Sequence, residues 1–263
     1  MRTLRYSAAL LLVLAVNLPA QTRYYVDSYQ DNDDETGLDT WSQAKKYLQS
    51  ALALAVNGDQ IWVAAGTYTG NFNIKDKMFI YGGFAGTEES LEERNWVDNK
   101  TILTNPGGTV VTFVRVSEAT VLDGFTITGG QATGRENPSG GGIYNENGSP
   151  RITNCTISGN TAGNGGGIYI HIGQIHDIAS PTFTNCLISG NVSTMRGGGI
   201  YSSNGNPTFT NCTISGNRSS EGLDGGGGGI GGINTSPGRP TLTNCIVWGN
   251  STPWIKNQSY TTV

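Results

Sequence analysis

The sequence predicts an all-β solenoid, a single-stranded parallel β-helix with a short capping helix at its N-terminal end. The main observation is a nine-residue phrase that occurs as ITNCTISGN, FTNCLISGN, FTNCTISGN and LTNCIVWGN, at 152–160, 183–191, 209–217 and 242–250. A second phrase, GGGIY, alternates with it at 140–144, 165–169 and 197–201, and a blurred form follows at 228–233. Repetition at this length is the signature of a solenoid, whose units stack to bury a continuous core.

The repeats carry few charges and no helical pattern. Residues 125–263 contain five Asp or Glu, whereas residues 21–124 contain 15 of the 20 in the chain. Gly, Thr, Asn and Ser dominate the repeats and disfavour helix interiors. A leucine-rich repeat is excluded because residues 125–263 contain only three leucines. We therefore divide the chain into a signal peptide, an N-terminal cap with irregular first coils, and regular repeats, at 1–20, 21–123 and 124–263.

Residues 1–20 have the pattern of a secretory signal peptide. Arg2 and Arg5 precede an apolar run from Ala8 to Val16, and Ala20 offers a small residue at the cleavage point. The run is too short to span a bilayer comfortably, so we expect export and no membrane span in the mature chain. Removing the two arginines changes the net charge from 16 − 20 = −4 to 14 − 20 = −6, which disfavours nucleic acid as a partner.

The region before the repeats begins with a strand at 24–26 and a helix at 41–56. The helix is expected to be capped by Asp39 or Thr40 and to end at Asn57-Gly58-Asp59. Its apolar face consists of Trp41, Ala44, Leu48, Leu52 and Ala55. Such a helix would cover the open end of the β-helix, which otherwise invites aggregation. A strand follows at 61–63, and irregular coils continue to residue 123.

Each regular repeat is expected to form one three-sided coil. Ile152 and Ile157 are both apolar but five residues apart, and a straight strand would place them on opposite faces. The chain must therefore bend between them, and Asn154 suits the bend because Asn tolerates the left-handed region. Gly159-Asn160 turns the chain again. The GGGIY phrase supplies the third strand, with Ile143, Ile168 and Ile200 pointing inward.

Stacked coils would place like residues above one another. We expect an amide ladder of Asn154, Asn185, Asn211 and Asn244, and an apolar ladder of Ile157, Ile188, Ile214 and Val247. The four cysteines, 31, 26 and 33 residues apart, would also form a column: Cys155, Cys186, Cys212 and Cys245. A worn first copy at 124–130 has Phe125 at this position, which favours free thiols packed as small hydrophobes over a disulfide framework or a metal site.

The best binding candidates are aromatic. Tyr144, Tyr169 and Tyr201 each follow an inward Ile, so strand alternation points them outward in a column. Aromatic faces suit sugar rings, and Trp248 would also face out. The alternative is mutual stacking of the tyrosines that only stabilises the coils. Variable inserts at 131–139, 170–180 and 218–227 would project as loops, where recognition often resides.

The acidic residues give no catalytic constellation. Glycoside hydrolysis generally needs two carboxylates that face one site. The acids of the repeats are scattered at unlike positions: Glu136, Glu146, Asp177, Glu221 and Asp224. Asp123 is a lone acid. The histidines His171 and His176 lie in an insertion beside Asp177; this group offers a metal site, but we prefer the interpretation as a loop with solvated histidines. We therefore name no catalytic residue.

An acidic cluster near the N-terminus is the candidate for a Ca²⁺ site. Asp31, Asp33 and Glu35 offer hard oxygen ligands that suit Ca²⁺, but Thr36 stands where the Ca²⁺ loop of an EF-hand needs Gly. We prefer the other interpretation, a solvated loop, and expect no cofactor.

The alternation of GG[GA]I with FxxN, seen in FTNC at 183–186 and 209–212, resembles the polymorphic outer membrane protein repeat of secreted bacterial proteins. The opening YYVD…GDQIWVAAGTY is similar to the start of many pectate-lyase-like domains. The resemblance implies a right-handed β-helix, export to the extracellular or outer-membrane surface of a Gram-negative bacterium, and adhesion or surface display. Relatives of this kind continue into a C-terminal barrel or sorting domain, so we expect the sequence to be a fragment that lacks such an anchor.

Our first functional hypothesis is a non-catalytic β-helix that binds a glycan, or the surface of a host or neighbouring cell, at the cell envelope. The alternative is a polysaccharide lyase or glycoside hydrolase of the pectate-lyase-like fold, with its site in residues 24–124 or in sequence beyond residue 263. The fold hosts both classes, so fold alone does not choose between them.

Overall fold

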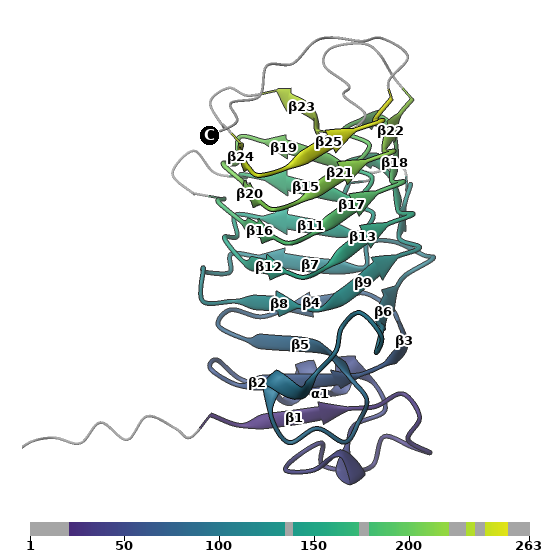
Figure 1. The fold of residues 1–263 in the computed structure, drawn as a ribbon, viewed down its shortest axis with the longest axis vertical. Coiled ribbons are helices and arrows are strands. Elements are labelled where there is room, and N and C mark those ends of the chain that lie inside the picture. Colours follow the sequence, from purple (N-terminus) through teal and green to yellow (C-terminus); the bar gives the residue numbers. More distant parts are fainter. Residues whose placement is uncertain (1–20, 135–138, 174–178, 221–229, 235–239, 252–263) are drawn as a thin grey trace, which may run out of the picture.

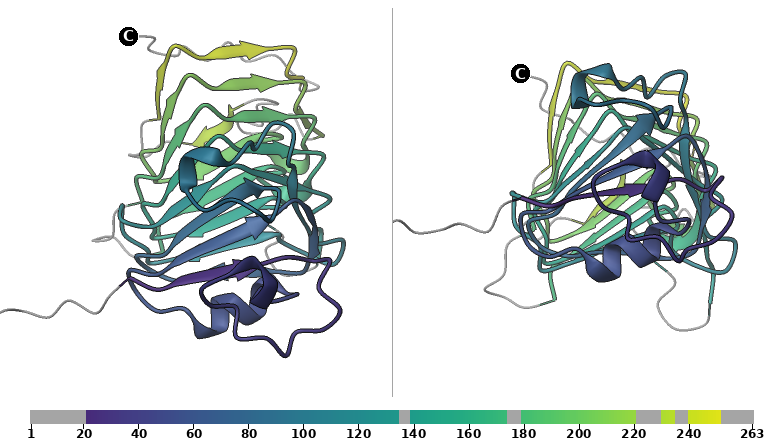
Figure 2. Two further views of the ribbon diagram at one scale, coloured as in Figure 1. Left: turned by 60° about the horizontal axis from the view of Figure 1, so that its bottom comes forward. Right: turned by 90° about the horizontal axis from the view of Figure 1, so that it is seen from below.

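The computed structural model describes residues 21–134, 139–173, 179–220, 230–234 and 240–251. These residues form a right-handed parallel β-helix whose coils follow one another in sequence order along the long axis (Figure 1). Seen from the N-terminal end, the coils superpose in a roughly three-sided outline (Figure 2, right). The fold class expected from the repeats is therefore confirmed.

Three long parallel sheets form the walls. Sheet A contains β1 (Arg23–Val26), β2 (Gln60–Ala64), β5 (Phe79–Phe84), β8 (Val121–Asp123), β12 (Arg151–Thr153), β16 (Thr182–Thr184), β20 (Thr208–Thr210) and β24 (Thr241–Thr243). Sheet B contains β3 (Gly66–Thr69), β6 (Thr101–Thr104), β9 (Phe125–Thr128), β13 (Thr156–Ser158), β17 (Leu187–Ser189), β21 (Thr213–Ser215) and β25 (Ile246–Trp248). Sheet C contains β4 (Phe72–Ile74), β7 (Val111–Val114), β11 (Ile143–Glu146), β15 (Ile168–His171), β19 (Ile200–Ser203) and β23 (Ile230–Asn234).

A fourth, shorter sheet lies between sheets B and C in chain order. Sheet D contains β10 (Gln131–Ala132), β14 (Thr161–Asn164), β18 (Val192–Arg196) and β22 (Arg218–Ser219). The expectation of three strands per coil is therefore incomplete. Sheet D forms because the residues after Asn160 remain extended and pair with the next coil, with Ala162 buried.

The bend between sheets A and B is where the sequence places it. Asn154 has φ 52°, and Asn185, Asn211 and Asn244 have φ 55°, 54° and 51°. This left-handed residue lets Ile152 and Ile157 both face the core, and both are fully buried. The bend prediction is confirmed.

The asparagine ladder lies mainly at a different position from the predicted one. In the Asn154 column, Asn185 Nδ2 donates to Asn154 Oδ1 at 3.3 Å, on the exposed side of the bend. A continuous buried ladder runs instead through the residue that closes each nine-residue phrase: Asn160, Asn191, Asn217 and Asn250. The first three are fully buried, because each amide also bonds the main chain of the coil before it.

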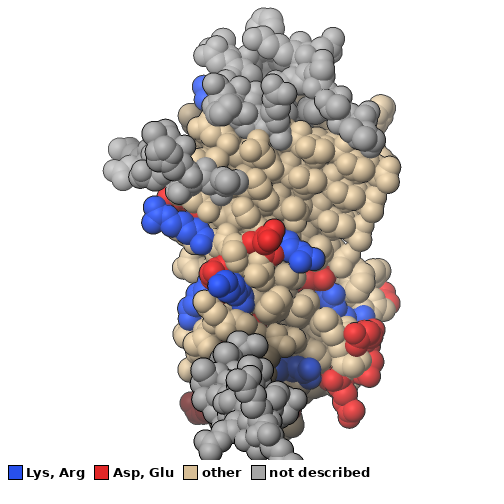
Figure 3. Space-filling model, turned by 90° about the vertical axis from the view of Figure 1, so that its left-hand side faces the viewer, with Lys and Arg blue, Asp and Glu red and all other residues tan. Residues whose placement is uncertain are grey.

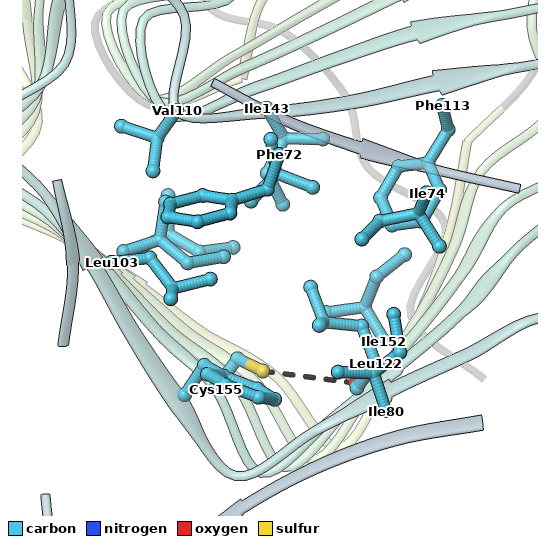
Figure 4. Close-up of a cluster of buried hydrophobic side chains, with 14 of the residues drawn as sticks. Phe72, Ile74, Ile80, Leu103, Val110, Phe113, Leu122, Ile143, Ile152 and Cys155 are labelled. Atoms are coloured by element: carbon cyan, nitrogen blue, oxygen red, sulfur yellow. Dashed lines mark hydrogen bonds between the residues drawn. The ribbon is translucent and has the colours of Figure 1, made fainter. Parts of the chain in front are cut away.

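The core is one continuous apolar column. Ile157, Ile188, Ile214 and Val247 stack in register on sheet B, as predicted. Figure 4 shows how side chains from the three walls meet in the middle. All four cysteines are free thiols, and Cys155 Sγ donates to the Leu122 carbonyl at 3.8 Å (Figure 4, dashed line). Phe125 occupies the cysteine position of the preceding coil and is 1% exposed.

The N-terminal helix is shorter than predicted. A 3-10 turn, η1, spans Trp41–Gln43, and the α-helix α1 spans Leu48–Leu54. Residues 44–47 are extended because Lys45 pairs with β1, donating to the Tyr25 carbonyl and accepting from the Asp27 N–H. Thr40 precedes η1 without a side-chain cap, so the predicted cap at Asp39 or Thr40 is wrong for α1. Sheet C begins at β4, so in the first coil α1 takes the place of a sheet C strand at the N-terminal end (Figure 2).

A second helical turn, η2 (Leu91–Glu93), belongs to the long excursion between β5 and β6. No helix in the described ranges has both the length and the apolar character needed to cross a bilayer. The signal peptide expected at 1–20 lies outside the described residues. The inserts expected at 131–139, 170–180 and 218–227 each begin with residues of a described strand, and most of their remaining residues lie outside the described ranges.

Candidate functional site

The outer face of sheet C gathers the polar and aromatic side chains that are best placed to meet a ligand. Its strands bury Ile143, Ile168 and Ile200, and the residue after each Ile points outward. Tyr144, Tyr169 and Tyr201 therefore stack in register, as predicted. Two residues further on, Glu146, His171 and Ser203 form a second outward column beside the tyrosines.

The tyrosine rings stack on one another. The ring centroids of Tyr144 and Tyr169 are 5.6 Å apart, and those of Tyr169 and Tyr201 are 5.5 Å apart, with interplanar angles of 24° and 19°. Arg196 Nη1 donates to the Tyr201 hydroxyl at 3.2 Å, and Tyr201 is only 7% exposed. This is the mutual stacking considered as the alternative, and it leaves ring edges and hydroxyls, rather than free faces, for a ligand.

Trp248 does not join this column. It lies on β25 of sheet B, above the column of Ser158, Ser189 and Ser215, and it is 77% exposed. The four aromatic residues predicted as one platform therefore lie on two sheets. Their role in glycan binding stays a prediction.

The hydroxyls of Tyr144 and Tyr169 remain protonated and can donate hydrogen bonds. Burial, together with the charge of Glu146 and a hydrogen bond to it, raises the pKa of Tyr144 to about 12. Burial and the neighbouring Tyr201 also raise the pKa of Tyr169. Tyr144 donates to Glu146 Oε2 at 3.1 Å, which fixes this carboxylate beside the column.

The second column brings together residues that the sequence appeared to scatter. Glu146 and His171 lie side by side in register on β11 and β15, and the imidazole stacks on Tyr169 with ring centroids 5.8 Å apart. His171 thus belongs to a strand and not to the insertion where it was expected. The signal was present in the sequence, because Glu146, His171 and Ser203 each follow the inward Ile by three positions.

Asn147 completes the group from the turn after β11, with φ 53°. Its Oδ1 accepts from the Gly173 N–H at 2.8 Å, and the residue is 8% exposed. Among the residues that the structure describes, its Nδ2 is buried without a hydrogen-bond partner, and so is Nδ1 of His171. Buried polar atoms are nearly always paired, so the orphaned Nδ2 of Asn147 points to a missing partner.

Asp123, the lone acid of the sequence, is already engaged. It forms an ion pair with Arg94 at 2.9 Å, and the two side chains are 13% and 7% exposed. Asn154 Nδ2 donates to its other oxygen at 3.0 Å, and Arg94 lies over the rings of Tyr81 and Trp96. The cluster ties the excursion between β5 and β6 to sheet A. Among the described strands, only Asp123 and Glu146 are carboxylates, and they lie on different sheets.

The predicted Ca²⁺ candidate has a structural explanation. Asp33 Oδ1 accepts from the N–H groups of Lys46 and Tyr47, and Oδ2 accepts from the Ser50 hydroxyl, so this side chain caps α1. Asp31 and Glu35 are exposed. No group of three or more His, Cys, Asp or Glu side chains within the described ranges could hold a metal ion, and His176 and Asp177 lie outside those ranges.

The upper coils are almost free of charge. In residues 152–173, 179–220 and 240–251 the charged side chains are Arg196 and Arg218. Figure 3 shows charged side chains gathered over the lower coils and a broad uncharged expanse above them. A groove of about 670 Å³ lies near the boundary and is lined by Glu118, Ala119, Ser149, Arg151, Ser180 and Thr182.

Comparison with known proteins agrees with the fold. A family model described as "Right handed beta helix region" matches residues 141–263. No curated protein matches the sequence. Solved structures with a similar fold include pectin methylesterase PemA from Erwinia chrysanthemi, at 14% identity and a TM-score of 0.45, over 85% of this chain and 65% of that one.

Two further solved structures have the same kind of similarity. A pectin methylesterase in complex with hexasaccharide VII has 15% identity and a TM-score of 0.45, over 87% of this chain and 66% of that one. Pectate lyase Pel9A has 12% identity and a TM-score of 0.38, over 90% and 79%. The chain therefore spans about 65% of the length of the esterases. Similarity at this level concerns the fold and not the activity.

Proposed function

We propose that this chain is an exported, non-catalytic β-helix that binds a glycan at the cell envelope through the outer face of sheet C. The observation that carries the proposal is the stacked column of Tyr144, Tyr169 and Tyr201 beside Glu146, Asn147 and His171. Aromatic edges next to amide, carboxylate and imidazole groups combine the apolar and hydrogen-bonding contacts that sugars offer.

The charge distribution favours an uncharged ligand. The upper coils expose Thr, Ser and Asn rather than Lys or Arg, so they supply hydrogen bonds but little attraction for an anionic polymer. A basic surface would bind an acidic glycan more strongly. The proposed partner is therefore a neutral polysaccharide, presented by the cell envelope or by another cell.

The positions of the two carboxylates on the described strands favour binding over catalysis. Two carboxylates aimed at one bond are needed for glycoside hydrolysis by the common mechanism. Asp123 is held in an ion pair on sheet A, whereas Glu146 accepts a hydrogen bond from Tyr144 on sheet C. The arrangement therefore supports recognition better than acid–base chemistry.

The proposal is tested by affinity electrophoresis of the mature chain through gels that contain neutral or acidic polysaccharides. We expect retardation by at least one neutral polymer, and weaker retardation of a variant with Tyr169→Ala and Tyr201→Ala. Tyr29→Ala, which removes an 82% exposed tyrosine outside sheet C, is the matched control. Equal retardation of the double variant and the wild type would reject the tyrosine column as part of the site.

Product analysis distinguishes the enzyme alternative from the binding proposal. Release of unsaturated or reducing sugars from acidic polysaccharides, with and without Ca²⁺, would replace the binding proposal with a lyase or hydrolase. N-terminal sequencing of the protein after expression in a Gram-negative host tests the separate proposal of export. We expect the mature chain to begin at Gln21.

A further inference from the structure

We propose that Glu146, Asn147 and His171, grouped around Gly173, form a pocket for two neighbouring hydroxyl groups of a neutral sugar. The inference rests on the proposed glycan-binding function and specifies the chemistry of the same face. We call these four residues the diol pocket.

The pocket is defined by convergence on one point. A Cβ atom built on Gly173 would lie 3.5 Å from Glu146 Oε1, 3.6 Å from Asn147 Nδ2 and 3.8 Å from His171 Nε2. Gly173 has no side chain and is exposed, so the space around that position is open to a ligand that approaches from outside. Three polar atoms from two adjacent coils therefore lie around the place that a side chain at position 173 would take.

The hydrogen bonds within the pocket determine which atoms are available. The Tyr144 hydroxyl donates a hydrogen bond to Oε2 of Glu146, which orients the carboxylate and leaves Oε1 toward the pocket. The Gly173 N–H donates a hydrogen bond to Oδ1 of Asn147. This bond fixes the orientation of the amide, so Nδ2 needs a separate acceptor. Within the described part of the chain, Nδ2 has no hydrogen-bond partner, although only 8% of Asn147 is exposed. An unpaired buried donor of this kind is unfavourable unless a partner binds.

A hydroxyl group can bond to both Glu146 and Asn147 at once. It donates its proton to Glu146 Oε1 and accepts from Asn147 Nδ2, which neither a carboxylate nor an ammonium group can do. A second hydroxyl on the adjacent carbon can bond to the His171 imidazole, which acts as a donor or an acceptor. The ring edge of Tyr169, which stacks on His171, then faces the apolar side of the sugar.

Charge and ligand type support the neutral assignment. Glu146 repels a uronate at close range, and the exposed Arg115 of the turn below offsets part of that charge at longer range. A divalent cation would be repelled by the partly positive hydrogens of Asn147 Nδ2. The pocket therefore discriminates by hydrogen-bond pattern rather than by net charge.

Isothermal titration of the mature chain tests the pocket. The probes are cellohexaose, mannohexaose and laminarihexaose, with hexagalacturonate as the charged comparison and Zn²⁺ and Ca²⁺ alone as further arms. We expect at least one neutral hexasaccharide to bind, and Glu146→Gln to weaken it by about tenfold or more through loss of a charged acceptor. Gly173→Ala should have a similar effect, because its methyl group would block the approach of a ligand to the three polar atoms.

Matched controls keep the test interpretable. Gly134→Ala adds the same methyl group where nothing lies within 4 Å, and it should leave the affinity and the melting temperature unchanged. The contacts around Gly173 are ordinary van der Waals distances, and its φ is not positive, so Gly173→Ala should fold with an unchanged melting temperature.

The outcomes are distinct. Binding of a hexasaccharide equally by the wild type and both pocket variants overturns the diol pocket while glycan binding stands. Absence of binding to every hexasaccharide overturns both. Tighter binding of hexagalacturonate, or binding of Zn²⁺ or Ca²⁺ that Glu146→Gln abolishes, replaces the neutral diol with an acidic sugar or a cation.

Discussion

At the residue scale, the repeat places asparagine at two positions with opposite environments. The column that begins at Asn154 occupies exposed or half-exposed bends and is chosen for its positive φ. The column that begins at Asn160 is buried, and each amide bonds both the next asparagine and the main chain of the previous coil. The first column depends on backbone conformation, whereas the second depends on side-chain hydrogen bonds.

This difference predicts unequal mutational costs. Asn191→Ala should lower the free energy of unfolding by about 3 kcal/mol or more, because it leaves Asn160 and the Ile157 carbonyl unpaired in the core. Asn185→Gly, in the same repeat, should cost only a few tenths of a kcal/mol, because Gly adopts the left-handed region freely. Urea unfolding of the two variants measures the difference, and similar midpoints would contradict the division of roles.

The cysteine column should resist thiol reagents in the folded state. Cys155, Cys186 and Cys212 are at most 2% exposed, whereas Cys245 is partly exposed. Burial raises the pKa of Cys155 to about 12, so its reactive thiolate is scarce at pH 8. We expect maleimide to label Cys245 first and the other three only in urea, as read by mass spectrometry. A disulfide-linked peptide in a non-reducing digest would contradict this arrangement.

At the element scale, α1 shows how a distant side chain can start a helix. The helix has seven residues and no cap from its own N-cap residue Tyr47. Asp33 supplies the acceptors instead, from a loop that sequence reasoning treated as solvated or as a Ca²⁺ site. Sequence patterns locate caps next to the helix, so a cap 14 residues before Tyr47 carries no local signal.

Removing this cap should loosen the N-terminal end. Asp33→Ala should destabilise the protein by about 1 kcal/mol, a typical value for a helix cap, whereas the exposed neighbour Asp34→Ala should have little effect. Thermal unfolding monitored by circular dichroism compares the two. Equal melting temperatures would show that α1 does not depend on Asp33.

The same carboxylate contributes to the pH dependence of stability. Partial burial alone would raise its pKa, but hydrogen bonds from Ser50, Tyr47 and Lys46 outweigh this and hold the pKa of Asp33 below its ordinary value. The folded state thus binds the proton more weakly than the unfolded state. The stabilisation is present above the ordinary value of 3.8 and is lost as the pH falls through the lower native pKa. As the pH falls below 3.8, Asp33→Ala should therefore lose less stability than the wild type, as measured by urea unfolding at a series of pH values.

At the scale of the whole molecule, the sequence was informative where one residue type recurs at one position. The coils, the inward isoleucines, the Asn154 bend and the tyrosine register follow from the repeat and from strand alternation. Sheet D was missed because its strands have two to five residues and no shared phrase. The Glu146–His171 pairing was missed because unlike residues share a column, and only the Ile-based register reveals it.

The register of the whole solenoid is tested most directly at neighbouring residues of β17. Ile188 is fully buried in the core ladder, whereas Leu187 points outward and is 38% exposed. Ile188→Asp buries an unpaired charge among apolar side chains of three coils, and should cost several kcal/mol or prevent folding. Leu187→Asp introduces the same side chain one position away and should leave the melting temperature nearly unchanged. Because each coil is stabilised mainly by its neighbours, the damage from Ile188→Asp should centre on the adjacent coils, and hydrogen exchange should report fast amides there before the N-terminal cap opens. If Leu187→Asp proved the more damaging change, the strand would be facing the opposite way and the outward assignment of every column in these repeats would be wrong.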